Sequence, residues 1–187
     1  MKKVVRQSFF GGSTIAVAKK LLGMDLVRKL GGRIIRMPIS EVEVYDGPDD
    51  KASHAFSGKT HRNLPMFGPP GYIYVYLVYG KYYMLNIITR EIGYPAAILI
   101  RGAGMYDGPG KLTRGLNISK SINGKLLHPR SGLWIEKNSG VRGGNIKIIS
   151  LPRVGVSYAG HRWASRKLRF LSRSKVSPYV DRQTKIK

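Results

Sequence analysis

Alternation of hydrophobic and polar residues predicts a strand-rich chain, and the alternation is clearest between residues 71 and 101. This stretch holds seven of the eleven tyrosines, set among isoleucine, valine and leucine, and a Gly80-Lys81 pair divides it into two halves. The pattern predicts a β-hairpin with Tyr79 beside its turn. Tyr74 and Tyr76 are expected on one face of the first strand, because alternate side chains of a strand point the same way.

The pattern elsewhere predicts one early helix, a second hairpin and several later elements. Ser13-Thr14 can cap a helix over IAVAKKLL that Gly23 ends. DLVRKL and RIIRM, joined by two glycines, favour a hairpin, and Pro38 is expected to interrupt the chain before an alternating strand, ISEVEVY. Later elements are a buried strand in AAILIR, a short helix after DGPG, and strands in LWIEK and NIKIISLP.

Two less regular stretches join these elements. Residues 46–70 form a long connection in which we expect one helical turn near residues 50–55 and an exposed Met66-Phe67 pair. Long ordered loops are often functional. Near the end of the chain, HRWASRKLRFLSRSK is a dense basic run anchored by Trp163 and Phe170, and the final VDRQTKIK is expected to fray.

Composition then limits the class of protein. The chain has 187 residues with 42% hydrophobic content, which predicts one domain, 1–187, with a core over about 13–172. Thirty-three Lys and Arg against ten Asp and Glu give a formal net charge of +23, which indicates nucleic acid or an anionic membrane surface as partner. Without cysteines, and with four histidines at no metal-binding spacing, neither metal nor cofactor is expected. No stretch is long and apolar enough to span a bilayer, so an intracellular protein is the expectation.

Acidic residues are rare in this chain, so two carboxylates on one strand face stand out. Glu41, Glu43 and Tyr45 share a parity in the strand ISEVEVY. Arg101 ends the strand AAILIR, where a guanidinium can meet a carboxylate or a phosphate. Each feature also has an ordinary structural explanation: Glu43 on a surface strand, Arg101 in an ion pair, His54 and Asn86 as satisfied polar groups, and the tyrosines as core packing.

Several segments, in the same order along the chain, resemble the alkyladenine (3-methyladenine, or methylpurine) DNA glycosylase family. They are KKLLGMDLVR, SEVEVYDGPDDKASHAFSGKTHRN, MFGPPGYIYVYLVYGKYYMLNI, AILIRG, DGPGKL, RVGVSYAG and LRF, and they cover roughly residues 21–170. The resemblance implies a single compact α+β domain around a curved, open barrel-like antiparallel sheet, with a protruding hairpin that intercalates into DNA. It also implies a monomer that acts on double-stranded DNA containing damaged purines, in the cytoplasm at the nucleoid, or in the nucleus of a eukaryote.

Roles for individual residues follow from the same resemblance. Glu43 matches the family's catalytic glutamate, which activates water, and Arg101 matches the arginine that helps to hold this water. Four matches concern the flipped base: Tyr45 and Tyr76 stack on it, His54 hydrogen-bonds its edge, and Asn86 disfavours the exocyclic amine of guanine. Five residues are expected at the DNA: Tyr79, which fills the gap in the duplex, and Arg62, Met66, Lys81 and Lys111. Val44 and Lys81 depart from the family pattern.

The implied reaction is the removal of a damaged purine. An enzyme of this kind must extrude the base from the stack, and a carboxylate can then activate water against the N-glycosidic bond. Hypoxanthine, 3-methyladenine, 7-methylguanine and ethenoadenine are the expected substrates, without lyase activity. Two alternatives stay open: a general nucleic-acid-binding protein, and a lesion-binding relative without turnover. Only the enzyme needs Glu43.

Overall fold

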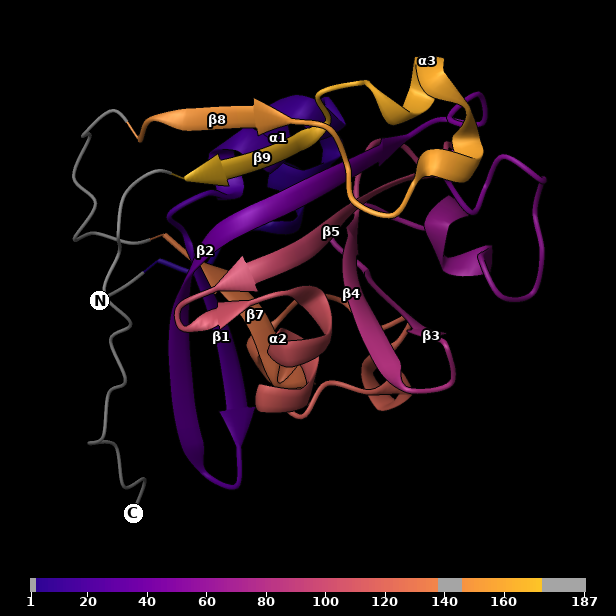
Figure 1. The fold of residues 1–187 in the computed structure, drawn as a ribbon. Helices are drawn as coiled ribbons and strands as arrows, with labels where there is room; N and C mark the ends of the chain where they lie inside the picture. Colours follow the sequence, from indigo (N-terminus) through magenta and orange to yellow (C-terminus); the bar gives the residue numbers. More distant parts are fainter. Residues whose placement is uncertain (1–2, 138–145, 173–187) are drawn as a thin grey trace.

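The protein folds as a mixed α+β domain dominated by a large antiparallel sheet (Figure 1). The computed structural model describes residues 3–137 and 146–172. The expected frayed segment VDRQTKIK and the last three residues of the basic run lie outside these residues. The predicted α+β class is confirmed, whereas the described strands do not close into a barrel, because the path β3-β4-β5-β2-β1-β7 ends at two strands that do not pair with each other.

Nine strands and three helices make up the described domain, with short 3₁₀ turns between them. The strands are β1 (Asp25–Leu30), β2 (Arg33–Asp46), β3 (Ile73–Val78), β4 (Tyr82–Ile88), β5 (Ala96–Ala103), β6 (Tyr106–Asp107), β7 (Leu133–Glu136), β8 (Ile148–Leu151) and β9 (Arg169–Ser172). The helices are α1 (Thr14–Leu21), α2 (Pro109–Gly115) and α3 (His161–Ala164). The 3₁₀ turns are η1 (Gln7–Gly11), η2 (Leu64–Phe67), η3 (Lys120–Ile122), η4 (Pro129–Ser131) and η5 (Ser157–Ala159).

Strand β2 is the longest strand and joins the two parts of the sheet. Its first half pairs with β1, and its second half lies between β5 and β9. We expected Pro38 to break this strand, and that expectation is wrong. Pro38 ends the pairing with β1, and the pairing with β5 begins at Ile39 with a register shift before Val42. A proline is tolerated beside such an irregularity because the regular ladder of N–H donors is interrupted there.

Both predicted hairpins form, and their turns use backbone of positive φ. Gly31 and Gly32 connect β1 to β2 with φ values of 50° and 79°. Tyr79 and Gly80 connect β3 to β4 with φ values of 52° and 64°, and the Lys81 N–H donates to the Val78 carbonyl at 3.0 Å. Two left-handed residues suit the twist of a tight hairpin, but they are costly for tyrosine.

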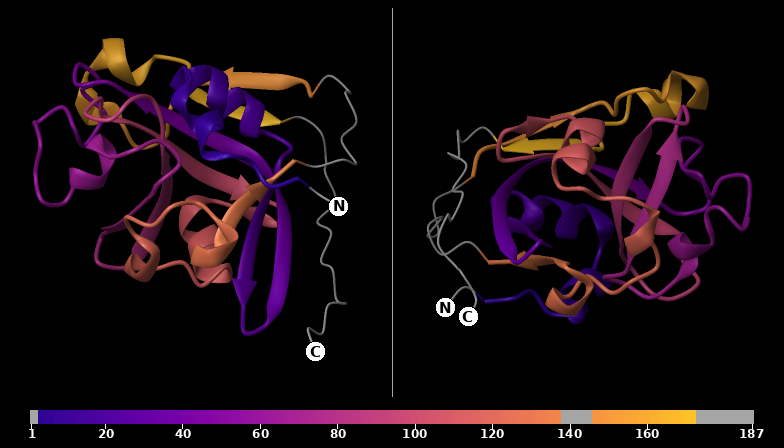
Figure 2. Two further views of the ribbon diagram at one scale, coloured as in Figure 1. Left: turned by 180° about the vertical axis from the view of Figure 1, so that it is seen from behind. Right: turned by 90° about the horizontal axis from the view of Figure 1, so that it is seen from below.

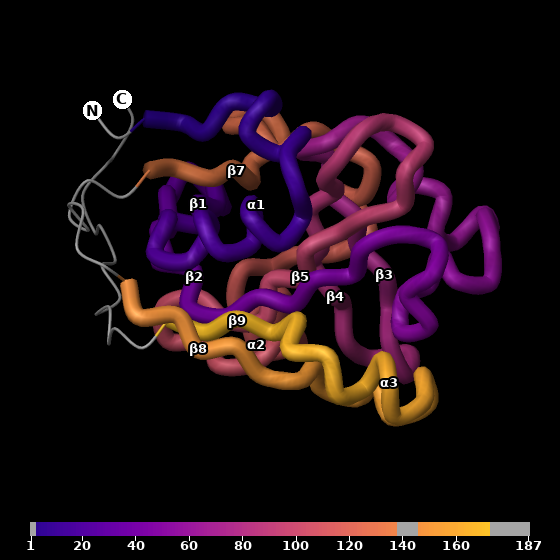
Figure 3. The backbone as a smooth tube through the Cα atoms, turned by 90° about the horizontal axis from the view of Figure 1, so that it is seen from above, coloured from indigo at the N-terminus to yellow at the C-terminus, as the bar shows by residue number. Residues whose placement is uncertain are grey.

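Helix α1 packs on the face of the sheet formed by β2 and β5 (Figure 3). It begins and ends one residue earlier than predicted, and Ser13 at its N-cap makes no side-chain capping hydrogen bond. Its apolar side buries Val17, Ala18 and Leu21 in the main core. Val5 and Phe10 belong to the same core, so packing begins before residue 13. The core therefore fills the space between α1 and the strands.

The long connection after β2 lies with the β3–β4 hairpin at the end of the molecule away from the N-terminus (Figure 2). The helical turn expected near residues 50–55 is absent. Instead, successive hydrogen-bonded turns link Ser53 to Asp50 and Phe56 to Ser53, and η2 follows later. The expected exposure of Met66 is also wrong, because Met66 is 2% exposed and packs in a second apolar cluster with Tyr74.

Candidate active site

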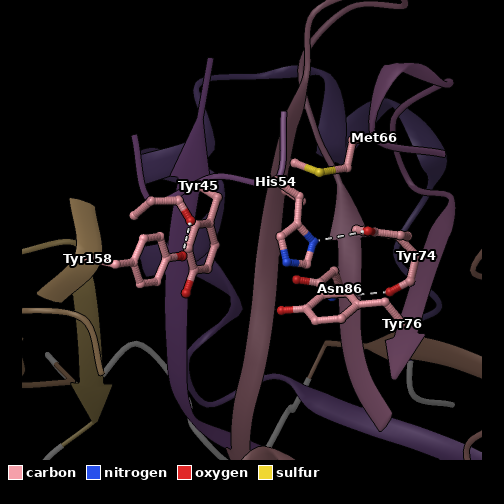
Figure 4. Close-up of a pocket in the computed structure, with 9 residues that line it drawn as sticks. Tyr45, His54, Met66, Tyr74, Tyr76, Asn86 and Tyr158 are labelled. Atoms are coloured by element: carbon pink, nitrogen blue, oxygen red, sulfur yellow. Dashed lines mark hydrogen bonds between the residues drawn. The ribbon is translucent and has the colours of Figure 1, made fainter. Parts of the chain in front are cut away.

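A small cavity lies where β2, β3 and β4 meet the long connection (Figure 4). Its volume is about 40 Å³, and its walls are mainly aromatic. The lining residues are Tyr45, Ala52, His54, Met66, Tyr74, Tyr76, Asn86, Ala97 and Tyr158. The four residues predicted to hold a flipped base, Tyr45, His54, Tyr76 and Asn86, are therefore brought together in one cavity.

Tyrosine rings form two facing sides of this cavity. Figure 4 shows Tyr45 and Tyr158 on one side and Tyr74 and Tyr76 on the other, with His54 between them. The Tyr76 ring lies 4.4 Å from the His54 ring, in an edge-on arrangement at 67°, and 5.2 Å from the Tyr74 ring. Facing aromatic rings can stack on a flat aromatic ligand.

Neutral polar groups occupy one edge of the cavity. Burial lowers the pKa of His54, and the nearby Arg62 guanidinium lowers it further, so the imidazole is neutral at pH 7. His54 Nδ1 lies 3.2 Å from the Tyr74 hydroxyl, whose pKa is raised by burial to about 12. The Nδ2 atom of Asn86 donates to two main-chain carbonyls, each at 3.2 Å, so this amide can offer a ligand only its carbonyl oxygen.

Glu43 lies fully buried behind Tyr45, with 0% of its surface exposed. Its Oε1 accepts the Val154 N–H at 2.8 Å, and its Oε2 accepts the Tyr45 hydroxyl at 3.0 Å. Burial raises the pKa of this carboxyl, whereas the Arg101 guanidinium and the two hydrogen bonds oppose that rise. A carboxylate whose pKa is raised by burial is a stronger base than an exposed one, which suits it to accept a proton.

Arg101 lies between two carboxylates rather than facing one. Its Nε is 2.8 Å from Glu41 Oε1, and its Nη1 is 3.4 Å from Glu43 Oε2. Arg169 on β9 also reaches Glu41, at 3.0 Å. The expected contact between Arg101 and Glu43 is present, but the shorter bond goes to Glu41, which therefore fixes the direction of the guanidinium.

The residues predicted to lie at the DNA are spread over several surfaces. Tyr79 is 93% exposed at the hairpin turn, with exposed Lys81 two residues on. The Arg62 guanidinium lies near the Tyr76 ring and donates to the Leu77 carbonyl at 2.9 Å. Lys111 is on α2, in an exposed ion pair with Asp107 at 2.7 Å. Met66 is instead part of the cavity wall.

Sequence reasoning missed three residues of the site. The position of Tyr74 in the cavity could have been predicted, because Tyr74 shares the face of Tyr76 on β3. Val154 and Tyr158 lie in the segment RVGVSYAG, which resembles the family, but no periodic pattern places them at the site. The fold brings Val154 to Glu43 and Tyr158 to the cavity. The Tyr158 hydroxyl donates to the Ala52 carbonyl at 3.0 Å and so ties this segment to the long connection.

Within residues 3–137 and 146–172, no group of three or more His, Cys, Asp or Glu side chains could hold a metal ion. Within the part of the chain that the structure describes, no helix is long and apolar enough to cross a bilayer.

The fold thus places a tyrosine-lined cavity beside a buried carboxylate. The family model for methylpurine-DNA glycosylase matches residues 8–106 and 102–176. Relatives named "Putative 3-methyladenine DNA glycosylase" include one from Methanocella arvoryzae (38% identity, 96% of each chain) and one from Legionella pneumophila (38% identity, 97% of this chain and 100% of the relative). A relative of the same name from Anaeromyxobacter dehalogenans is 42% identical over 94% of this chain and 84% of its own. The chain belongs to the methylpurine-DNA glycosylase family.

Proposed function

We propose that this protein is a base-excision-repair DNA glycosylase that removes damaged purines from duplex DNA. The observation that carries the proposal is the position of Glu43: it is buried beside the tyrosine-lined cavity, accepts two hydrogen bonds and forms an ion pair with Arg101. Family membership gives the reaction class, the excision of alkylated purines. The finer proposal is a range that includes 3-methyladenine, 7-methylguanine, hypoxanthine and ethenoadenine.

Binding begins with extrusion of the damaged nucleotide. Extrusion costs a few kcal/mol in an intact duplex and less where damage weakens the pair. Tyr45 and Tyr76 would then stack on the base, with about 1 to 3 kcal/mol per stacking contact. His54 would bond the purine edge. Because the Asn86 amide keeps its donors on the backbone, its exclusion of the guanine amine would rest on lack of space rather than on hydrogen bonding.

Hydrolysis needs a base and a stabiliser of positive charge. As the bond between C1′ and N9 breaks, its electron pair leaves with the purine and positive charge develops on the sugar. Glu43 accepts a proton from water, whose oxygen bonds to C1′, while Arg101 holds the water and the negative charge of Glu43 stabilises the sugar cation. No lysine is among the described residues that line the cavity, so water rather than an amine is the proposed nucleophile. The product is an abasic site in an uncut strand.

The β3–β4 turn suits a wedge that fills the gap after extrusion. Tyr79 is held in a left-handed conformation and is almost fully exposed. This conformation is costly for a tyrosine, and an exposed ring gains little from packing, so the arrangement points to a role outside folding. Inserted aromatic or apolar side chains can hold a base step open. Lys81, Arg62 and Lys111 would contact phosphates nearby, and the protein is proposed to act as a monomer on DNA in the cytoplasm.

The wedge can be tested by binding alone. Tyr79→Ala is expected to weaken binding to lesion-containing duplex about tenfold, as loss of one stacking contact implies, with the melting temperature unchanged. Unchanged affinity would reject the wedge.

The proposed function is tested by single-turnover incubation of the protein with duplex oligonucleotides that carry hypoxanthine or 7-methylguanine, followed by alkali to cut abasic sites. Wild type should yield alkali-dependent cleavage, and Glu43→Gln should yield little while still binding the lesion duplex. Tight lesion binding without cleavage by wild type would instead favour a non-catalytic lesion-binding protein. Equal affinity for damaged and undamaged duplex, also without cleavage, would favour a general nucleic-acid binder.

A further inference from the structure

Arg153 is a fully buried arginine in the segment between β8 and η5. Its side chain and that of its partner Asp50 are 0% and 1% exposed. Nη2 bonds Asp50 Oδ1 at 2.9 Å, and Nη1 bonds both Asp50 Oδ2 and the Val44 carbonyl. The guanidinium therefore makes a two-pronged ion pair inside the protein.

This one side chain joins three stretches that surround Glu43. Asp50 is in the long connection, Val44 lies between Glu43 and Tyr45 on β2, and Arg153 directly precedes Val154, whose N–H donates to Glu43 at 2.8 Å. The guanidinium also lies 4.8 Å from the centre of the Tyr45 ring. The Arg153 contacts therefore tie the residue next to Val154 to β2 and to the long connection, and Arg169 also holds this segment through the Pro152 carbonyl at 2.9 Å.

Burying such a pair is an expensive way to stabilise a fold. Desolvation of the two charges often exceeds their attraction, and apolar residues of similar volume usually do as well or better. Arg153 Nε adds to this cost, because it is buried without a hydrogen-bond partner in the described part of the chain. A two-pronged ion pair fixes the orientation of the groups that it joins, which apolar packing does not. The Val154 N–H must keep a fixed orientation to donate to Glu43.

We infer that Arg153, through its pair with Asp50, is a positioning residue for the reaction: it holds the Val154 N–H on the carboxylate of Glu43. The inference rests on the proposed function of Glu43 as the base. If the pair is removed, the amide is free to move away and one of the donors that keep the carboxylate ionised is lost. Burial then dominates, and the pKa of Glu43 rises further.

Other charged and titratable groups around Glu43 set the background for this effect. They come from every element that packs on the carboxylate: Glu41 and Tyr45 on β2, Tyr76 on β3, Arg101 on β5, Arg169 on β9, and Tyr158 beside Arg153 itself. A test must leave all of these in place.

The test is the pH dependence of single-turnover excision by the full chain with enzyme in excess. Asp50→Asn with Arg153→Met removes both charges together, so no unpaired charge is left behind. The rising limb of the profile, which reports the base, should move up by about one pH unit, so that the rate is roughly tenfold lower on the acid side of the limb and recovers at higher pH. A limb that coincides with that of wild type overturns the inference, whatever the stability of the variant.

A matched control separates positioning from general loss of stability. Buried Glu136 on β7 and half-buried Arg36 on β2 form another carboxylate–arginine pair, at 2.9 Å, away from Glu43. Glu136→Gln with Arg36→Met should lower the melting temperature without moving the limb. If the control moves the limb equally, the effect is not specific to Arg153 and the inference fails.

Two further measurements keep the inference testable if the double variant does not fold or if excision is not observed. Arg153→Lys keeps the charge but cannot form the two-pronged contact, and it should move the limb in the same direction by less. Carboxyl ¹³C NMR of the four glutamates gives the pKa of Glu43 without any turnover. A Glu43 pKa equal in wild type and Arg153→Lys overturns the inference, whereas absent excision with a shifted pKa contradicts only the proposed function.

Discussion

Glu41 and Glu43 stand two residues apart on β2, point to the same side of the sheet and share Arg101, yet their surroundings differ. The Glu41 side chain is 16% exposed, and its Oε1 accepts from Arg101 and Arg169 at 2.8 and 3.0 Å. The Glu43 side chain is fully buried, and its closest donors are a backbone amide and a tyrosine hydroxyl. Glu41 holds two arginines, whereas Glu43 accepts its hydrogen bonds from uncharged groups.

The difference shows that shared parity on a strand does not decide which carboxylate can do chemistry. The positive charges of two arginines at short range balance the negative charge of Glu41 and hold its side chain in place. Glu43 has one guanidinium, at 3.4 Å, and depends on neutral donors, so burial prevails and its pKa rises. We expect Glu41 to orient Arg101 and Glu43 to act as the base.

The largest effect should come from Glu43→Gln. Removal of a general base typically lowers a rate by about 10²- to 10⁴-fold, and Gln keeps the shape of the side chain. Single-turnover excision measured against wild type checks this expectation. A loss below tenfold would mean that another group activates the water.

Tyr45→Phe should have the next largest effect. The change removes the hydroxyl that donates to Glu43 at 3.0 Å but retains the ring that lines the cavity. Hydrogen bonds to charged groups contribute about 1.5 to 3 kcal/mol, so excision at pH 7 should fall at least roughly tenfold, while lesion affinity stays near wild type. Equal losses in rate and affinity would place the effect in stacking instead.

Glu41→Gln should have a smaller effect on rate. In this variant Arg101 loses its closer carboxylate partner but can still reach Glu43. Because the Arg101 side chain is displaced rather than removed, we expect the excision rate to fall by less than about tenfold. The same single-turnover assay applies. If Glu41→Gln proves as damaging as Glu43→Gln, the two carboxylates act as one unit and the contrast between them fails.

The smallest effect concerns stability. Because the folded-state pKa of Glu43 is raised, the unfolded chain releases this proton first as pH rises, and the folded state loses stability from the unfolded pKa up to the folded one. Gln does not titrate, so the melting temperature of Glu43→Gln minus that of wild type should increase as the pH rises above about 4.3, the usual pKa of a glutamate in an unfolded chain. Each kcal/mol corresponds to about 2 to 4 °C in a chain of this size. Calorimetry would contradict this if the difference were independent of pH.

Local periodicity predicted much of the site, and long-range packing supplied the rest. The two-residue repeat placed Glu43 and Tyr45 on one face, and a Gly80-Lys81 break located the hairpin. The same rules failed at Pro38, where a change of strand partner, invisible in the local pattern, lets the strand continue.

Burial and ion pairing were harder to predict than strand faces. Met66 looked exposed because its neighbours are loop residues, but the loop folds back on Tyr74. The pair of Asp50 with Arg153 spans 103 residues, and neither residue lies in a periodic segment that would predict their contact. The roles carried over from family resemblance, catalytic, base-binding and DNA-facing alike, stay predictions.

The separation along the chain between Glu43 and its partners also has a consequence for biosynthesis. Val154 follows Glu43 by 111 residues, and Arg169 follows Glu41 by 128. A ribosome releases the N-terminal strands first, and contacts over such distances form late in folding. The carboxylate therefore acquires its amide donor only when most of the chain has been made, so a nascent or truncated chain that displays the tyrosine hairpin still lacks a completed base.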